Sequence, residues 1–280
     1  NEEKAIDIWR MLLEMEPGNR RGQDSLKKLL TGRQEWEELE SLFKEWDKLE
    51  EYIRIISKEV DQQEEIADKV ALLFREARIW RQELDKEDRA MKAYEKLLSV
   101  DAQNLEAAEA LIELYSYAGL ERKLPDVLEI RINHTDDPML KRERMEELAD
   151  TYKEHLRDKD SAFNWYLQAF ELEPQQEGIW EHVEELAGSV KDGWQQLVEA
   201  YQKSYETFSD LQDALLLMLV VANAQENELE DKDGALSTCQ KILEVDASNT
   251  VALDASERIY REKQAWEELL EIYTRKIELS

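Results

Sequence analysis

The side chains that most often carry out chemistry are few in this 280-residue chain and form no recognisable site. Its three histidines share neither a common position nor a metal-binding spacing: His134, His155 and His182. The sequence contains no Gly-x-x-x-x-Gly-Lys phosphate loop, no Gly-x-Gly-x-x-Gly dinucleotide motif and no His-Glu-x-x-His metal motif. We therefore predict that the chain is not an enzyme and that it has no catalytic residue, no metal ligand and no cofactor.

Cys239 is the single cysteine, so no disulfide can form within the chain. A lone cysteine favours a reducing compartment, and no signal peptide or transit pattern begins the sequence, which together favour the cytoplasm. We expect Cys239 to be a core residue and not a nucleophile. The longest apolar run, residues 214–222, is less than half a membrane span, so no membrane insertion is predicted.

Four acidic clusters resemble calcium ligands at first sight: residues 2–3, 85–88, 158–160 and 231–233. None has the glycine and the terminal glutamate of a calcium loop. Each precedes a segment with helical periodicity, where carboxylates complement the positive end of the helix dipole. We interpret the clusters as helix caps.

The elements that hold these residues form an internal repeat. Four similar segments are anchored by alanines, and a second anchor, tryptophan in three copies, follows each alanine 31 or 32 residues later: Ala5 with Trp36, Ala90 with Glu121, Ala162 with Trp194, and Ala235 with Trp266. The last three alanines lie 72 and 73 residues apart, but the first two lie 85 apart. We interpret the extra residues, an insertion near 44–62, as a lengthened helix hairpin or a register slip within it.

Composition and periodicity predict an all-α fold. The chain has only eight glycines and four prolines, and apolar residues recur at helical spacings. We expect an α-α superhelix, a solenoid of antiparallel helix hairpins with about 15 helices, in which the tryptophan stripe is buried. It should form one continuous array over 1–280, with periods near 1–61, 62–137, 138–208 and 209–280. Because the array opens in mid-repeat, we expect a fragment of a larger protein.

The repeat resembles that of tetratricopeptide repeat (TPR) proteins, of the divergent bacterial type whose units alternate in pairs. The resemblance is carried by small residues followed three or four positions later by an aromatic one: Ala77 with Trp80, Ala149 with Tyr152, Ala5 with Trp9, Ala90 with Tyr94, and Ala162 with Tyr166. Two copies depart from the pattern, since Ala222 is followed by Gln225 and Ala235 by Cys239. Half-a-TPR (HAT) repeats look similar, but their Arg and Glu pattern is not consistently present.

The TPR resemblance implies a non-enzymatic protein–protein interaction scaffold that presents a superhelical groove to a peptide or protein partner. By register, the candidate groove-lining residues are Arg78, Arg81, Asp150, Lys153, Asn223 and Glu226. This set does not form a Lys/Asn cluster for a terminal carboxylate, so a helix or an extended segment is the expected ligand. The alternatives are a structural spacer array within a larger multidomain protein and a HAT-type RNA-processing assembly scaffold.

The net charge of −29 is uneven along the chain. Residues 1–34 balance at +1, so the remainder carries −30. An acidic surface repels phosphate groups, which argues against direct nucleic-acid binding. It favours a basic protein or peptide partner, or serves solubility alone. The apolar face of residues 3–16 and the basic residues between 20 and 33 lead us to expect weak self-association through the N-terminal end.

Overall fold

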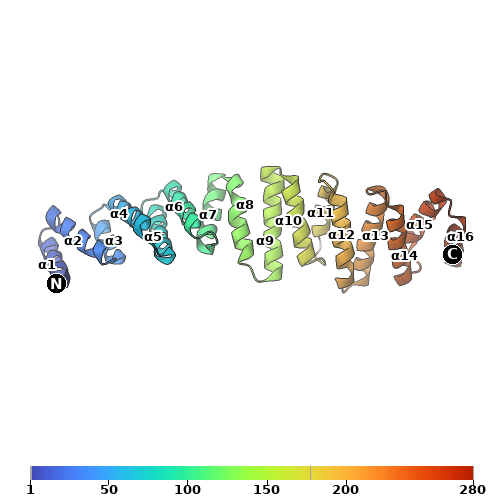
Figure 1. Ribbon diagram of the computed structural model, residues 1–280, viewed down its shortest axis with the longest axis horizontal. Helices are drawn as coiled ribbons and strands as arrows, with labels where there is room; N and C mark the ends of the chain where they lie inside the picture. Colours follow the sequence, from blue (N-terminus) through green and yellow to red (C-terminus); the bar gives the residue numbers. More distant parts are fainter. Residues whose placement is uncertain (1, 177, 280) are drawn as a thin grey trace. The chain divides into compact units, whose positions relative to one another are not determined.

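The protein is described here from a computed structural model, which covers residues 2–176 and 178–279. Every secondary-structure element in these ranges is helical, and sixteen of them are α-helices (Figure 1). Helices that are consecutive in the chain pack against one another as antiparallel hairpins. The predicted all-α fold of helix hairpins is therefore confirmed. No helix in the described ranges is long and apolar enough to cross a membrane.

The helices belong to two compact units, and the boundary between Leu114 and Tyr115 falls within α7. Unit 1 contains α1 (Glu2–Met15), α2 (Arg20–Gly32), α3 (Trp36–Glu45), α4 (Leu49–Gln62), α5 (Ile66–Arg78), the π-helical turn η1 (Ile79–Glu83), α6 (Glu87–Val100) and most of α7 (Leu105–Ala118). The prediction of one continuous array with four periods stays a prediction.

Unit 2 contains the remaining helices. They are η2 (Glu121–Lys123), α8 (Leu124–Asn133), α9 (Pro138–Asp150), the π-helical turn η3 (Thr151–Leu156), α10 (Lys159–Leu172), α11 (Ile179–Ala187), α12 (Gly193–Ser204), η4 (Tyr205–Thr207), α13 (Leu211–Asn227), α14 (Lys232–Val245), α15 (Thr250–Lys263) and α16 (Trp266–Glu278). A buried cluster joins the last four α-helices and includes Met218, Cys239, Leu253 and Ile272. Burying such side chains contributes roughly 1.5–3 kcal/mol each, so stacking of neighbours stabilises the unit.

The insertion near residues 44–62 is a helix of its own. One period runs from the helix of Ala90, α6, to the last helix before that of Ala162, α9, and contains four α-helices. The period that begins with the helix of Ala5, α1, and ends before α6 contains five. The additional helix is α4, which packs between α3 and α5 through the buried residues Tyr52 and Ile56. Where a lengthened hairpin or a slipped register was expected, the structure thus has one more helix.

The turns between helices repeat as regularly as the helices. In all four copies the residue two positions before the second anchor lies in the left-handed region: Gln34 (φ 57°), Gly119 (φ 65°), Asp192 (φ 56°) and Gln264 (φ 56°). The anchor alanines of the last three copies follow another left-handed residue five positions earlier: Asp85, Arg157 and Glu230. Only one of these seven positions is glycine, so six of the turns carry a side chain in a conformation that favours glycine.

Helix capping agrees with the interpretation of two acidic clusters. The carboxylates of Asp158 and Asp231 accept hydrogen bonds from backbone N–H groups of the first turns of α10 and α14. These bonds satisfy donors that a helix start leaves without an intrahelical partner. The side chain of Cys239 is fully buried, which confirms its place in the core. Burial raises the pKa of its thiol.

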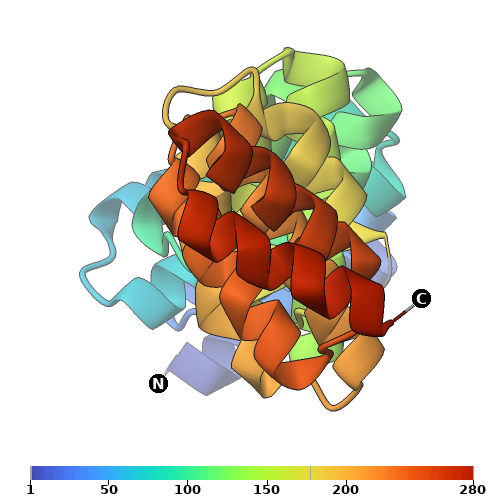
Figure 2. The same ribbon diagram turned by 90° about the vertical axis from the view of Figure 1, so that its right-hand side faces the viewer.

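Two of the tryptophan anchors are less buried than expected. Trp266 is 62% exposed, and Trp194 is only half-buried. In Figure 2 the helix that carries Trp266, α16, lies in front of the other helices of unit 2. The outward face of α16 also exposes Leu270 and Ile277. The prediction of a uniformly buried tryptophan stripe is therefore wrong, because burial needs a neighbouring helix on that face.

Candidate functional site

The six predicted groove residues lie near the C-terminal ends of three odd-numbered helices. Arg78 ends α5 and Arg81 lies in η1; Asp150 ends α9 and Lys153 lies in η3; Asn223 and Glu226 lie in the last two turns of α13. Arg78 and Arg81 belong to unit 1, and the other four belong to unit 2. Among the described residues, no hydrogen bond or ion pair joins Asp150 or Lys153 to Asn223 or Glu226.

Three of these residues form ion pairs with a common spacing of 32 residues. Arg81 donates to Glu113 at 2.7 Å, and Lys153 donates to Glu185 at 2.7 Å. In the third pair the charges are reversed, since Arg258 donates to Glu226 through Nε at 2.7 Å and Nη2 at 2.6 Å. Each pair links one odd-numbered helix to the next: α5–η1 to α7, α9–η3 to α11, and α13 to α15.

Each ion pair shifts the pKa of one of its members in the direction that favours the charged form. The hydrogen bond from Lys153 holds the pKa of Glu185 below its usual range. The hydrogen bonds to Glu113 and Glu226 raise the pKa of Arg81 and of Arg258 respectively. A partner that approaches any one of these residues therefore meets an ion pair and not an isolated charge.

The other two predicted residues of unit 2 make local contacts. Asp150 accepts a hydrogen bond from the hydroxyl of Tyr166, a fully buried residue of α10. Burial and this bond to a carboxylate raise the pKa of Tyr166. Asn223 accepts from Asn227 one turn further along α13 at 2.7 Å. Neither residue presents a geometry for binding a metal or for catalysis.

Arg78 belongs to a charged cluster in unit 1 that sequence reasoning did not identify. The carboxylate of Glu40, on α3, accepts from Arg75 at 2.5 Å through one oxygen and from Arg78 at 2.5 Å through the other. Glu40 is largely buried, and both arginines lie on α5 one turn apart. Charge-assisted bonds of this length are about twice as strong as neutral ones. Glu40 therefore fixes both guanidinium groups against α3.

A pocket of about 550 Å³ opens beside this cluster. It is formed by α3, α5, α6, the start of α7 and the π-helical turn, and its walls include Phe74, Gln82, Tyr94 and Glu106. The volume lies within the range of roughly 300–1,000 Å³ that is usual for ligand sites. Two aromatic residues of the lining, Phe74 and Tyr94, form what we call its aromatic floor, and their rings meet edge to face with centroids 6.1 Å apart; the rest of the lining is mostly polar. Burial raises the pKa of Tyr94, so its hydroxyl is neutral.

The charges that line the pocket are unevenly compensated. Glu40 is occupied by two arginines, whereas Glu37 reaches Arg75 only at 3.9 Å and is almost fully exposed. The side chain of Glu106 makes no hydrogen bond or ion pair within the described part of the chain; it is exposed and lines the pocket. Two arginines against three glutamates leave the pocket with one surplus negative charge.

One sequence signal could have revealed the paired residues. Opposite charges recur 32 residues apart in all three regular copies, although the sign is exchanged in the third. That spacing is the length of one hairpin, so it places two side chains on equivalent positions of successive odd-numbered helices. The Glu40 cluster had no such signal, because its arginines lie 35 and 38 residues away and not 32.

The histidines do not form a site. The ring of His182 stacks on that of Tyr166, with centroids 4.8 Å apart, and Nδ1 of His134 contacts the carbonyl oxygen of Ile130 at 2.9 Å. Within residues 2–176 and 178–279, no three His, Cys, Asp or Glu side chains are grouped so that they could hold a metal ion.

Comparison with known proteins finds its similarities among solved structures. No protein-family model and no curated protein matches the chain. The TPR domain of P58(IPK) has a TM-score of 0.33 and 14% identity, over 98% of this chain and 87% of that chain. A TPR protein from Parabacteroides merdae has a TM-score of 0.32 and 14% identity, over 91% and 90% of the two chains.

YrrB, described as a TPR protein with an unusual peptide-binding site, has a TM-score of 0.30 and 14% identity. The similarity covers 71% of this chain and 96% of YrrB. TPR proteins are among the solved structures to which this chain is similar. Identities at this level concern the fold alone.

Proposed function

We propose that the chain is a protein-interaction scaffold whose helix array binds an extended, basic segment of a partner in the unit 1 pocket. The observation that carries the proposal is the combination of an aromatic floor with surplus carboxylates at the opening. Phe74 and Tyr94 offer apolar surface to one side chain of the segment. Glu37 and Glu106 are the carboxylates available to its lysine or arginine.

Pairing with Glu40 explains why the arginines of the pocket do not reverse this preference. Arg75 is held by Glu40 and largely covered, and Arg78 is turned toward the same carboxylate. An acidic ligand would have to displace Glu40 from two short bonds. A basic ligand leaves these bonds intact and gains the remaining acids.

The pocket also favours a scaffold over a simple spacer. A spacer array needs only buried faces between neighbouring helices, so its surface requires no open pocket with an aromatic floor. Here half-buried Phe74 and exposed Gln82 line an opening large enough for a side chain and its backbone. The exposed amide of Gln82 offers both a donor and an acceptor to an extended backbone.

Selection from a random peptide library, followed by photocrosslinking, tests the proposal. We expect enriched peptides to pair Lys or Arg with a neighbouring apolar residue. A photoreactive side chain at position 82 should crosslink to such a peptide, whereas the same group at exposed Glu64, outside the pocket, should not. Enrichment of acidic peptides, or equal crosslinking from both positions, contradicts the proposal.

A further inference from the structure

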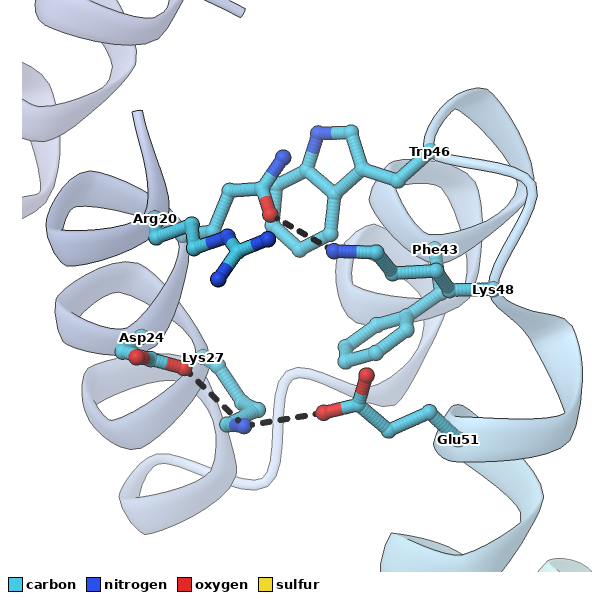
Figure 3. A pocket seen from close by; sticks show the side chains of 8 residues that line it. Arg20, Asp24, Lys27, Phe43, Trp46, Lys48 and Glu51 are labelled. Atoms are coloured by element: carbon cyan, nitrogen blue, oxygen red, sulfur yellow. Dashed lines mark hydrogen bonds and ion pairs between the residues drawn. The ribbon is translucent and has the colours of Figure 1, made fainter. Parts of the chain in front are cut away.

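A second pocket of unit 1 has the opposite charge balance. It measures about 100 Å³ and lies between α2 and the turn that joins α3 to α4. Figure 3 shows the side chains of Arg20, Lys27 and Lys48 directed into it, together with two carboxylates and Trp46. Nothing in the proposed scaffold function uses this pocket.

Only one of the three cations is compensated by acids. Lys27 contacts Asp24 at 3.3 Å and Glu51 at 3.1 Å, so both carboxylates of the pocket converge on it. Lys48 donates at 2.9 Å to the neutral amide oxygen of Gln23. The side chain of Arg20 makes no hydrogen bond or ion pair with any described residue. The pocket therefore carries one surplus positive charge in a chain whose net charge is −29.

The local backbone positions one of the two uncompensated cations, Lys48. Asp47 adopts a left-handed conformation (φ 56°), and the amide of Lys48 donates to the carbonyl oxygen of Phe43 at 2.8 Å. These features close the end of α3 and direct Lys48 back toward α2. Arg20 lies in the first turn of α2, where the positive end of the helix adds to its charge.

The wall of the pocket is aromatic. Trp46 is half-buried and Phe43 is almost fully buried, and their ring centroids lie 5.2 Å apart. The indole supplies apolar surface for the methylene groups of a long side chain. A carboxylate at the end of that side chain would then reach the guanidinium of Arg20 and the ammonium of Lys48.

We propose that this pocket binds a carboxylate side chain, glutamate or aspartate, from an acidic protein segment. A single surplus charge matches a monoanion, whereas Asp24 and Glu51 beside the cations repel the second charge of a phosphate. The acidic segment has two sources, a different protein or a second copy of this chain, whose residues 206–280 hold 17 Asp/Glu against seven Lys/Arg.

Titration with a hexaglutamate peptide, acetylated and amidated so that only side-chain carboxylates are present, tests the assignment. We expect saturable binding that shifts the indole N–H signal of Trp46, identified by its loss in Trp46→Phe. Arg20→Gln and Lys48→Gln should each weaken binding by about two- to fivefold, the range for partly exposed ion pairs. Arg21→Gln, an equal charge change on the next, exposed residue, should leave the affinity unchanged.

The remaining outcomes decide against the assignment. Equal weakening by Arg20→Gln and Arg21→Gln would mean a diffuse charge effect and no pocket. Binding of capped hexaglutamine as tight as hexaglutamate, or tighter binding of inorganic phosphate, overturns the choice of a carboxylate.

Sedimentation over a concentration series identifies the source: a dimer that dissociates with hexaglutamate points to a second copy, and a monomer points to another protein.

Discussion

Glu226 and Arg258 form a two-pronged ion pair between α13 and α15 in which the carboxylate is almost covered, with 8% of its side chain exposed, while the guanidinium stays half-exposed. The two residues are 32 positions apart, as are Arg81 and Glu113 and also Lys153 and Glu185, where the positive residue comes first. The contact between successive odd-numbered helices therefore requires opposite charges but not a fixed order.

The first prediction exchanges these charges. Glu226→Arg alone should lower the free energy of unfolding by about 1–2 kcal/mol, because two guanidinium groups then face each other. The double variant Glu226→Arg with Arg258→Glu should recover at least half of that loss, as expected for contacting residues. Denaturant unfolding of the two single variants and the double variant measures the coupling. Additive losses would contradict direct pairing.

The second prediction concerns the left-handed turns. Gln264 has φ 56° two residues before α16, so Gln264→Gly should raise the free energy of unfolding by about 1 kcal/mol through relief of backbone strain. Gly119, with φ 65° at the equivalent turn, is the matched control. Gly119→Ala should lower stability by a similar amount. The same sign for both variants would show that the two turns are not equivalent.

The third prediction follows from the exposure of α16. Trp266→Ala should change stability by less than about 0.5 kcal/mol, the usual limit for exposed positions. Leu269→Ala, on the buried face of the same helix, should cost about 2–5 kcal/mol. Thermal or denaturant unfolding compares the two. A loss for Trp266→Ala as large as that for Leu269→Ala would mean that another surface covers the indole.

The fourth prediction concerns alkaline pH. Burial raises the pKa of Tyr52, whose hydroxyl donates to the carbonyl oxygen of Trp36 at 2.8 Å. Above its unfolded pKa of about 10 the unfolded chain loses this proton while the folded chain keeps it, so stability falls by up to about 1.4 kcal/mol per pH unit for each such tyrosine. Below that pH the contribution is fully present.

Tyr52→Phe isolates this effect. The variant should be less stable at neutral pH by about 1 kcal/mol, because it lacks the hydrogen bond. Between pH 10 and 11 its stability should fall less steeply than that of the unchanged protein. Parallel pH profiles for the two proteins would argue against a raised pKa at Tyr52.

The sequence anticipated the features that depend on local periodicity. The anchors Ala90, Ala162 and Ala235 are fully buried, and Cys239 occupies the core position of an aromatic residue, because helical spacing alone decides which side of a helix faces inward. Exposure of Trp266 could not be predicted in this way. Its pattern equals that of Trp194, and only the presence of a neighbouring helix distinguishes the two.

The candidate sites were less accessible to sequence reasoning. The register singled out Arg78, but its partner Glu40 lies 38 residues away across the additional helix α4. The basic segment of α2 was noted for its charge, yet Trp46 and Lys48 join it only through the turn after α3. Ile8 of the N-terminal helix is exposed while Leu13 is buried, so the expected self-association through this end stays a prediction.

The most direct test of the scaffold function is calorimetric titration of a library-selected basic peptide into the unchanged protein and two variants. Glu37→Gln combined with Glu106→Gln should weaken binding by about three- to tenfold, since two exposed carboxylates are lost. Glu64→Gln, an exposed carboxylate outside the pocket, should bind as the unchanged protein does. An affinity that is the same in all three proteins would contradict a basic-segment site in the unit 1 pocket.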